Sequence, residues 1–308
     1  MAKVFIDGSS GTTGLRIRER LSERKDIELI SVPYEERHDP LVRKYAMAKA
    51  DIAFLCLPDD SAKESAALAE DLDTVIIDTS TAHRVSEGWV YGLAELEGQK
   101  EKIAKAKRIA NPGCHATGFI ALVEPLVKAG IIKADQFLQC TSLTGYSGGG
   151  KKMIAQYEDE NRDPLLDAPR LYGLTQTHKH LKEMKALCSL EHFPAFSPVV
   201  ADFYSGMETI IPLFKEEING TAEDIIQVYQ KLYQGNIIRY ADISKDGMIS
   251  AAYMKGRDDM LVHVEGNEDR IVLCAVFDNL GKGASGAAIQ NMNIVLGIDE
   301  TEGLVIGE

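Results

Sequence analysis

The sequence predicts an α/β protein of two domains, a doubly wound parallel sheet followed by an α+β domain. Three observations lead to this prediction. The first 110 residues alternate short apolar runs with amphipathic stretches, as repeated β-α units do. After about residue 128, β-type runs become more frequent and are separated by longer irregular stretches. The length of 308 residues is enough for two cores of ordinary size.

Five short apolar runs are predicted as the strands of the first domain. They are Val4–Ile6, Ile27–Ser31, Ile52–Leu57, Val75–Asp78 and Arg108–Ala110. Between the first two runs, Leu15, Ile17 and Leu21 lie at helical spacing among Arg and Glu residues, which predicts a helix with one buried face. A strand that runs through a turn into such a helix is the repeating unit of a Rossmann-type domain.

The second half carries a different set of apolar runs. They are Phe137–Leu143, Val199–Tyr204, Thr209–Leu213, Leu261–Val264 and Ile271–Phe277. The last long segment, Gly286–Leu296, has Ala, Ile, Met and Val at helix-compatible spacing, and we expect it to pack back on the first domain. We therefore predict a first domain of residues 1–115, completed by the C-terminal segment 284–308, and a second domain of residues 116–283.

The composition excludes several classes of protein. A net charge of −13 repels nucleic-acid phosphates and anionic lipid, so we expect neither a nucleic-acid nor a membrane partner. The five cysteines are odd in number and include no Cys-x-x-Cys pair, which argues against a disulfide framework and against zinc. The sequence also shows no signal-peptide pattern and no long apolar run. We expect a cytoplasmic protein with no bound metal.

A glycine-rich turn joins the first predicted strand to the first predicted helix. Its glycines are spaced Gly-x-x-Gly-x-x-Gly, which departs from the Gly-x-Gly-x-x-Gly of many dinucleotide sites. In a strand-turn-helix context, such a turn lets backbone N–H groups approach a pyrophosphate at the positive end of the helix. A plain glycine-rich turn is the alternative. The expected cofactor-binding residues of this turn are Gly8, Ser10, Gly11, Thr12, Thr13 and Gly14.

The residues after the second strand bear on the choice of cofactor. Glu35, Glu36 and Arg37 stand where a residue that contacts the ribose is expected. Arg37 favours a 2′-phosphate and hence NADP, whereas a glutamate there favours NAD. A solvated surface arginine explains Arg37 equally well.

Cys114 is the candidate nucleophile. Pro112 and Gly113 end a strand, and the apolar periodicity that follows predicts a helix, so Cys114 stands at or near a helix N-terminus. The helix dipole and unsatisfied N–H groups there favour a thiolate and can hold an oxyanion. The other cysteines lie in or beside apolar runs, and we expect them to be buried and structural: Cys56, Cys140, Cys188 and Cys274.

A second reactive segment contains His178, Lys179, His180 and Glu183. A metal site is the weakest interpretation, because no third ligand with suitable spacing is evident and the lysine opposes a cation. A thiolate cysteine needs a histidine that moves protons, and either His178 or His180 can serve. Glu183 can orient that imidazole. The choice between the two histidines stays open at this level.

Three further segments can bind anions. Ser147, Gly148 and Gly149 precede two lysines and can bind a phosphate or carboxylate of the substrate, with a flexible loop as the alternative. Arg84 follows the fourth strand, at the sheet edge where α/β proteins bind ligands, and is a candidate clamp for a carboxylate or phosphate. Asn279 and Lys282 precede the last helix and are expected near the cofactor.

Taken in order, these motifs resemble those of N-acetyl-γ-glutamyl-phosphate reductases of the shorter form, and more distantly those of aspartate-semialdehyde dehydrogenases. Two positions depart from the family pattern, which often has proline where this chain has Ala94 and Lys182. The matching segments cover nearly the whole chain. They are Gly8–Gly14, Asp78–Arg84, Tyr91–Leu96, Asn111–Cys114, Ser147–Gly150, His178–Glu183 and Asp278–Ala284.

The resemblance implies an activity. It implies that NADPH reduces N-acetylglutamyl 5-phosphate to the semialdehyde through a thioester on Cys114, a step of arginine biosynthesis, with His178 or His180 as acid/base. It also implies an NADP-binding first domain, a catalytic and dimerisation second domain, and a homodimer or homotetramer. Three alternatives stay open: a dehydrogenase acting on another acyl phosphate, a non-catalytic dinucleotide-binding protein, and a cysteine hydrolase.

Overall fold

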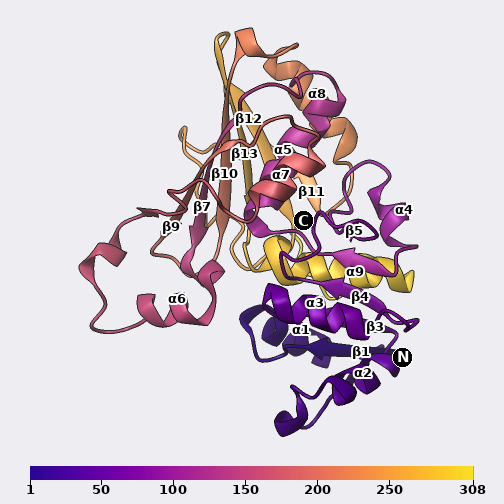
Figure 1. The fold of residues 1–308 in the computed structure, drawn as a ribbon. Coiled ribbons are helices and arrows are strands. Elements are labelled where there is room, and N and C mark those ends of the chain that lie inside the picture. The colour runs from indigo at the N-terminus through magenta and orange to yellow at the C-terminus, as the bar shows by residue number, and fades with distance from the viewer. Residues whose placement is uncertain (308) are drawn as a thin grey trace. The chain divides into compact units, whose positions relative to one another are not determined.

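The computed structural model describes residues 1–307, which form two compact units (Figure 1). Unit 1 comprises Met1–Ala94, Gly98–Pro112 and Ala284–Leu304. Unit 2 comprises Glu95–Glu97, Gly113–Gly283 and the residues from Val305 on. Within residues 1–307, no helix is both long enough and apolar enough to cross a membrane.

Among the described residues, unit 1 contains a six-stranded sheet in the order β2-β1-β3-β4-β6-β5. Its strands are β1 (Ala2–Asp7), β2 (Ile27–Ile30), β3 (Ile52–Leu55), β4 (Val75–Asp78), β5 (Val90–Tyr91) and β6 (Arg108–Ala110). Every pairing in this sheet is parallel. The predicted runs are therefore strands, and β5 was missed because two residues show no periodicity.

Helices cover both faces of this sheet. They are α1 (Thr12–Ser22), α2 (Pro40–Ala48), α3 (Asp59–Leu68), α4 (Gln99–Ile103) and α9 (Gly286–Leu296). Val4 of β1 shares a buried cluster with Ile17 of α1 and Met292 of α9. The next residue, Phe5, points to the other face and packs in a cluster with Met47 of α2. This alternation buries the sheet on both sides, as in a doubly wound fold.

In the part of the chain that the structure describes, unit 2 contains a mixed seven-stranded sheet in the order β11-β12-β13-β10-β7-β9-β8. The four central neighbours, β12, β13, β10 and β7, pair antiparallel, whereas β7 pairs parallel with β9. The strands are β7 (Gln139–Gly145), β8 (Arg170–Leu171), β9 (Ala195–Ala201), β10 (Met207–Phe214), β11 (Ile238–Tyr240), β12 (Met260–Gly266) and β13 (Arg270–Phe277). The predicted pairing of a parallel-sheet domain with an α+β domain is confirmed.

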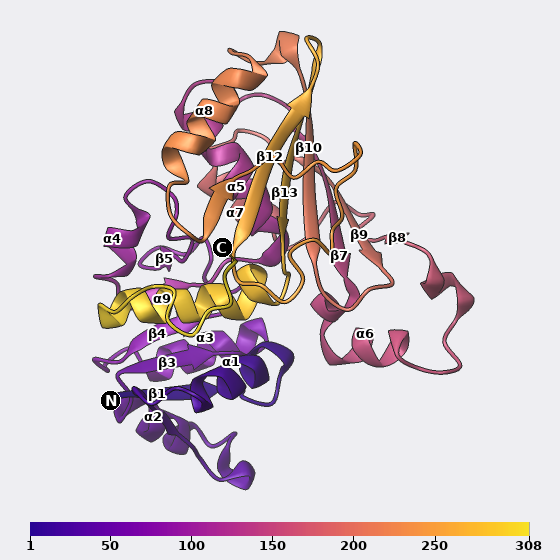
Figure 2. The same cartoon turned by 180° about the vertical axis from the view of Figure 1, so that it is seen from behind.

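One face of the second sheet carries the helices of unit 2. They are α5 (Cys114–Lys128), α7 (Leu181–Leu187) and α8 (Ala222–Leu232), while α6 (Gly150–Tyr157) lies on the excursion between β7 and β8. Along β10, Met207, Thr209 and Ile211 are fully buried on the helix side. Pro212 and Phe214 point to the opposite face, which Figure 2 shows from the side away from α5 and α7.

Candidate active site

Cys114 is the first residue of α5, as the sequence predicts. Gly113 precedes the helix in an extended conformation and, as a glycine, supplies no side-chain cap. The first turn also contains no acidic residue. The positive end of the helix dipole therefore lies at the Cys114 thiol, where it favours a thiolate.

The other four cysteines are poor nucleophiles. Burial raises the pKa of Cys56 to about 12. Burial also raises the pKa of Cys140, Cys188 and Cys274 well above that of an ordinary thiol. These four thiols stay protonated at neutral pH.

Unit 2 brings three histidines together beside the start of α5. The ring centroids of His178 and His180 lie 4.7 Å apart, and that of His115 lies 5.5 Å from His178 and 5.6 Å from His180. The main-chain N–H of His180 donates to Nδ1 of His178 over 3.2 Å. A neutral His178 therefore carries its proton on Nε2, where it can be donated.

Glu183 is tied to the same place. Its side chain is buried on α7, and its Oε2 accepts a hydrogen bond of 3.1 Å from the N–H of Gly113. This bond links α7 to the residue that precedes Cys114. Glu183 thus helps to hold the helix start at which the thiol lies.

Two residues of this cluster were missed by the sequence reasoning, His115 and Tyr172. His115 is buried, with Nδ1 2.8 Å from Ser142 Oγ and Nε2 2.6 Å from the hydroxyl of Tyr172. Burial, together with His178, lowers the pKa of His115 to about 3. The available signals were the position of His115 directly after Cys114 and of Tyr172 six residues before His178.

The glycine turn of unit 1 shows why glycine is needed at two of its three positions. Gly8 has φ +87°, and a Cβ there would lie 2.3 Å from the carbonyl oxygen of Cys56. A Cβ on Gly14 would lie 2.4 Å from the carbonyl oxygen of Gly8. Gly11 is different, because its Cβ would meet no atom of the described residues closer than 3.6 Å. Gly11 precedes α1, whose start has no side-chain cap within the described residues.

Arg37 lies on its neighbour Tyr34. Its guanidinium carbon is 3.6 Å from the Tyr34 ring centroid, and its Nη1 donates to the Tyr34 carbonyl oxygen over 2.5 Å. The residue follows a 3₁₀ turn at Tyr34–Glu36, beyond the end of β2. These contacts hold the guanidinium against the ring and main chain of Tyr34.

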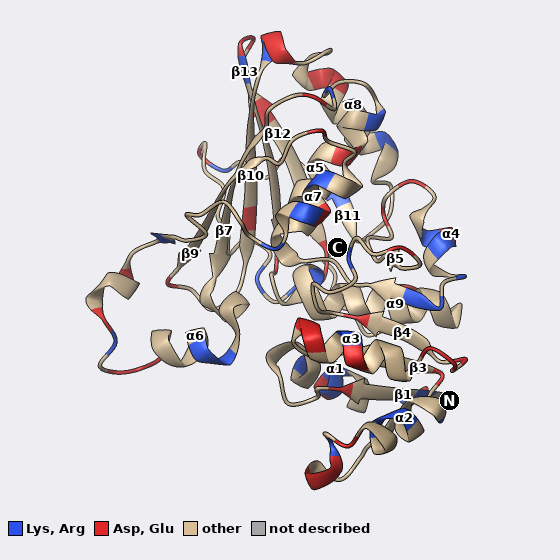
Figure 3. Ribbon diagram, in the orientation of Figure 1, with Lys and Arg blue, Asp and Glu red and all other residues tan. Residues whose placement is uncertain are grey.

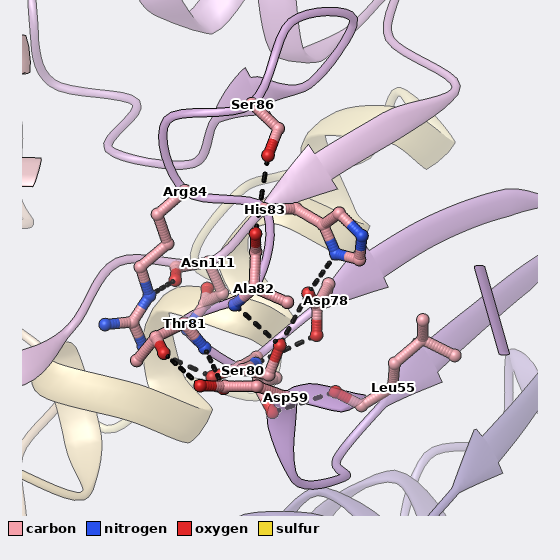
Figure 4. Close-up of polar contacts among 11 residues, drawn as sticks. Leu55, Asp59, Asp78, Ser80, Thr81, Ala82, His83, Arg84, Ser86 and Asn111 are labelled. Atoms are coloured by element: carbon pink, nitrogen blue, oxygen red, sulfur yellow. Dashed lines mark hydrogen bonds and ion pairs between the residues drawn. The ribbon is translucent and has the colours of Figure 1, made fainter. Parts of the chain in front are cut away.

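The segment after β4 is organised by the buried carboxylate of Asp78 (Figure 4). Asp78 accepts hydrogen bonds from the N–H and the hydroxyl of Ser80, at 2.9 and 2.7 Å. Its Oδ2 also lies 2.6 Å from Nδ1 of His83, whose ring stacks on Trp89 at a centroid distance of 4.0 Å. His83 is thus a packed residue of unit 1.

Arg84 follows this segment and is held by main-chain oxygens. Its Nε donates to the carbonyl oxygen of Asn111 over 3.0 Å, and its Nη2 donates to that of Thr79 over 3.2 Å (Figure 4). These bonds orient the guanidinium within unit 1. An oriented guanidinium suits a phosphate or carboxylate.

The structure brings Ser147 and Asn279 together. The side-chain amide of Asn279 donates to Ser147 Oγ over 3.0 Å, and its Oδ1 accepts from the N–H of Gly206 over 2.9 Å. Ser147 is buried, whereas Gly148 and Gly149 are exposed. Asn279 therefore fixes the glycine-rich segment to β10 and the strand end at Phe277.

Lys282 is fully buried, and its Nζ forms an ion pair of 2.6 Å with Glu95 Oε1. A buried lysine needs such a partner to stay charged. Glu95 lies in the short segment Glu95–Glu97, which belongs to unit 2.

Cations occur beside two candidate segments of unit 2 (Figure 3). Lys151 and Lys152 lie in the first turn of α6, after the exposed glycines, and Lys182 and Lys185 lie on α7, after the histidines. In a chain with a net charge of −13, these lysines make the surroundings locally more favourable to an anion.

Comparison with known proteins places both units in one class. The family model described as semialdehyde dehydrogenase, NAD binding domain matches residues 3–106. The model described as semialdehyde dehydrogenase, dimerisation domain matches residues 114–279. The two units are therefore those of the semialdehyde dehydrogenase class.

Two relatives identify the family within this class to which the chain belongs. N-acetyl-gamma-glutamyl-phosphate reductases from Brucella ovis and Brucella suis are each 47% identical to this chain over 306 residues, covering 96% of this chain and 99% of the relative. The chain belongs to the N-acetyl-gamma-glutamyl-phosphate reductase family. This confirms the resemblance that the motifs indicate.

Solved structures show the same fold at low identity. Aspartate semialdehyde dehydrogenase II from Vibrio cholerae, in complex with ASA, aligns with a TM-score of 0.71 at 16% identity, over 96% of this chain and 98% of that chain. The enzyme from Candida albicans with NADP aligns with a TM-score of 0.66 at 17% identity, over the same shares. These likenesses concern the fold alone.

Proposed function

We propose that this chain reduces N-acetyl-L-glutamyl 5-phosphate to N-acetyl-L-glutamate 5-semialdehyde and phosphate, with NADPH as the reductant and Cys114 as the nucleophile. The observation that carries this proposal is the position of Cys114 at the start of α5, beside the histidine cluster of unit 2. Membership of the reductase family supports the choice of substrate.

The chain's own residues account for the covalent steps. The Cys114 thiolate attacks the acyl carbon, the C–O bond to phosphate breaks, and a thioester forms on Cys114. N–H groups at the start of α5 stabilise the negative charge that develops on the carbonyl oxygen. After reduction, the C–S bond breaks, the aldehyde leaves and the thiolate is restored. Stabilisation of the thiolate helps both its attack and its departure.

The turn of unit 1 fits the cofactor. Gly8 and Gly14 let the turn close tightly, and the open surroundings of Gly11 leave room at the positive end of α1 for a pyrophosphate. Ser10, Thr12 and Thr13 flank that position, and Arg37 is the proposed ligand of a 2′-phosphate. Asn279 and Lys282 remain proposed cofactor residues. When bound, NADPH supplies the hydride that reduces the thioester.

Substrate contacts are part of the proposal. Arg84 is the proposed ligand of a substrate phosphate or carboxylate, supported by its orientation on two carbonyl oxygens. The second proposed set of substrate-binding residues is Ser147, Gly148 and Gly149. The exposed backbone of the two glycines, beside two lysines, supports this proposal.

His178 is the proposed acid, and its replacement is expected to have the larger effect of the two histidines. His178→Gln should lower kcat/KM by about 10² to 10⁴-fold and remove one limb of the pH–rate profile, because the protonated Nε2 is lost. His180→Gln should keep that limb. If both variants retain the wild-type pH profile, neither histidine is the acid.

The reaction itself is tested in both directions. With the purified chain, we expect N-acetylglutamyl 5-phosphate to drive NADPH oxidation, followed as the loss of absorbance at 340 nm. In reverse, NADP reduction by the semialdehyde should require inorganic phosphate, because phosphate must cleave the thioester. Reverse turnover without phosphate would contradict the thioester route, and turnover with aspartyl phosphate alone would point to the related dehydrogenase activity.

We further propose that the chain forms a homodimer or homotetramer through the face of the second sheet that the helices leave open. Phe214 is 56% exposed there and Val272 is 39% exposed, with the half-buried Ile210 on the same face. An apolar sheet face of this kind typically packs against a partner. The match of residues 114–279 to a dimerisation domain supports the proposal.

Phe214→Asp is expected to convert the oligomer to monomers, because it places a charge in an apolar interface. Phe193→Asp is the matched control, since Phe193 is 54% exposed and lies outside the sheet. Light scattering after gel filtration gives the mass of each variant. A Phe214→Asp protein with the wild-type mass would contradict this choice of face.

A cytoplasmic location completes the proposal. A catalytic thiolate needs a reducing compartment, and the chain's other four cysteines are thiols that burial protects. The proposed partners are the acyl phosphate and further copies of the chain, with neither nucleic acid nor membrane.

A further inference from the structure

The carboxylate of Asp278, directly after β13, is fully buried and accepts four hydrogen bonds. Its Oδ1 accepts from the main-chain N–H groups of Leu280 and Gly281, at 2.8 and 2.9 Å. Its Oδ2 accepts from the hydroxyl of Ser205 and from the N–H of Gly256, both over 2.7 Å. A carboxylate can be buried only where donors replace its water in this way.

These bonds fix the shape of the segment 278–283. Ser205 lies between β9 and β10, and Gly256 lies before β12, so Asp278 ties its own segment to two others of unit 2. The N–H of Gly283 donates to the carbonyl oxygen of Asp278 over 3.0 Å and closes the segment into a turn of five residues. Turns of this π type are rare and often occur at functional sites.

The turn brings Gly283 against the nucleophile. A Cβ on Gly283 would lie 2.9 Å from Cβ and 3.4 Å from Cα of Cys114. The first distance is well below the contact distance of two carbon atoms, so any side chain at this position would push Cys114 aside. The main chain of Gly283 therefore packs directly on the first residue of α5.

We propose that Asp278 and Gly283 are positioning residues for the nucleophile: Asp278 fixes the turn, and Gly283 holds the Cys114 side chain beside the N–H groups at the start of α5. The proposal rests on the role of Cys114 in the proposed function. Displacement of a reacting group by about 1 Å lowers a rate by about 10²-fold, so a turn that packs on Cys114 bears directly on its attack.

The first test separates the position of the thiol from the amount of folded protein. The protein is mixed with N-acetylglutamyl 5-phosphate without NADPH, and phosphate release in the first turnover is followed with time. The amplitude counts the folded chains, whereas the rate measures attack by Cys114. Asp278→Asn should lower the rate by about 10- to 100-fold and keep the amplitude, because an amide cannot accept at both oxygen positions. A wild-type rate, with or without a lower amplitude, overturns the proposal.

Asp224→Asn is the matched control for this variant. Its Oδ2 accepts from the N–H and the hydroxyl of Thr221, at 2.8 and 2.7 Å, so it too is a carboxylate that binds a main-chain donor and a hydroxyl. A Cβ on Gly220 would contact both Asp224 and Ile131, which places Asp224 near the end of α5 that is opposite to Cys114. This variant should keep the wild-type rate of phosphate release.

Gly283→Ala tests the contact itself. The new methyl group should displace Cys114 and lower the same rate by about 10- to 100-fold. The double variant Asp278→Asn/Gly283→Ala should be about as slow as the slower single variant, because both changes act on one contact. Gly235→Ala is the control, since a Cβ there would meet no atom of the described residues within 4 Å. Fully additive losses would mean that the two residues act separately, which contradicts the proposal.

Alkylation of Cys114 by iodoacetamide gives a readout without substrate. A displaced thiol loses part of the stabilisation that the helix start gives its thiolate, so Asp278→Asn and Gly283→Ala should each react about 2- to 5-fold more slowly at pH 7. Wild-type alkylation rates in both variants overturn the proposal. Slower alkylation in the variants of a protein whose wild type reduces no acyl phosphate supports the Gly283 contact and contradicts the proposed function instead.

A measurement on the wild type serves if both variants fail to fold. With glycine and cysteine selectively labelled, NMR should show a nuclear Overhauser effect between the Hα protons of Gly283 and the Hβ protons of Cys114. Its absence overturns the proposal, because the contact through which Gly283 acts would then not exist in solution.

Discussion

Cys114→Ser is expected to lower acyl-phosphate reduction by at least about 10⁴-fold while NADPH still binds. A serine hydroxyl at the start of α5 is not ionised at neutral pH, so it cannot replace the thiolate that the helix start favours. The assay is NADPH oxidation at saturating acyl phosphate. NADPH binding is measured separately, by quenching of protein fluorescence or by calorimetry.

Cys274→Ala is the control for this variant. Cys274 is buried on β13, where its thiol contacts Glu208, and burial raises its pKa, so its loss should leave turnover within about threefold of wild type. Wild-type turnover in Cys114→Ser would remove the nucleophile from the mechanism. Equal losses in both variants would mean that the serine protein is merely misfolded.

Gly8→Ala is expected to destabilise unit 1 by about 3 to 5 kcal/mol and to abolish NADPH binding. Two effects add here. An alanine at φ +87° is strained, and its Cβ would lie 2.3 Å from a main-chain oxygen that cannot move without shifting the end of β3. Urea unfolding followed by circular dichroism gives the change in the free energy of unfolding.

Gly11→Ala separates cofactor binding from folding. Its backbone has φ −75°, and a Cβ there would make only ordinary contacts, so the free energy of unfolding should change by less than about 1 kcal/mol. NADPH affinity should nevertheless fall, because the new methyl group occupies the space proposed for the pyrophosphate. A Gly8→Ala protein as stable as wild type would contradict this account of the turn.

Most of the central strands could be predicted from local pattern. The runs at Val4–Ile6, Val75–Asp78 and Ile271–Phe277 each lie within a strand because consecutive apolar residues face a core. The two-residue strands β5 and β8 could not be predicted, because only their tertiary pairing defines them. The Gly286–Leu296 helix was predicted with its bounds, and its apolar residues lie in the core of unit 1.

In the candidate site, too, some features follow from the local sequence and others depend on tertiary packing. Cys114 could be found because the end of a strand and the start of a helix are both marked in the local sequence. The contact of His115 with Ser142 and Tyr172 could not, because it depends on how α5 packs against the second sheet. Lys282 illustrates the same limit, since the ion-pair partner of this buried lysine, Glu95, lies 187 residues away in the sequence.

The thioester on Cys114 is the central claim, and mass spectrometry tests it directly. The protein is mixed with N-acetylglutamyl 5-phosphate in the absence of NADPH and quenched in acid within seconds. We predict one N-acetylglutamyl group per chain on the peptide that contains Cys114, with release of one equivalent of phosphate. An unmodified Cys114 peptide, or an acyl group on another residue, would contradict the account.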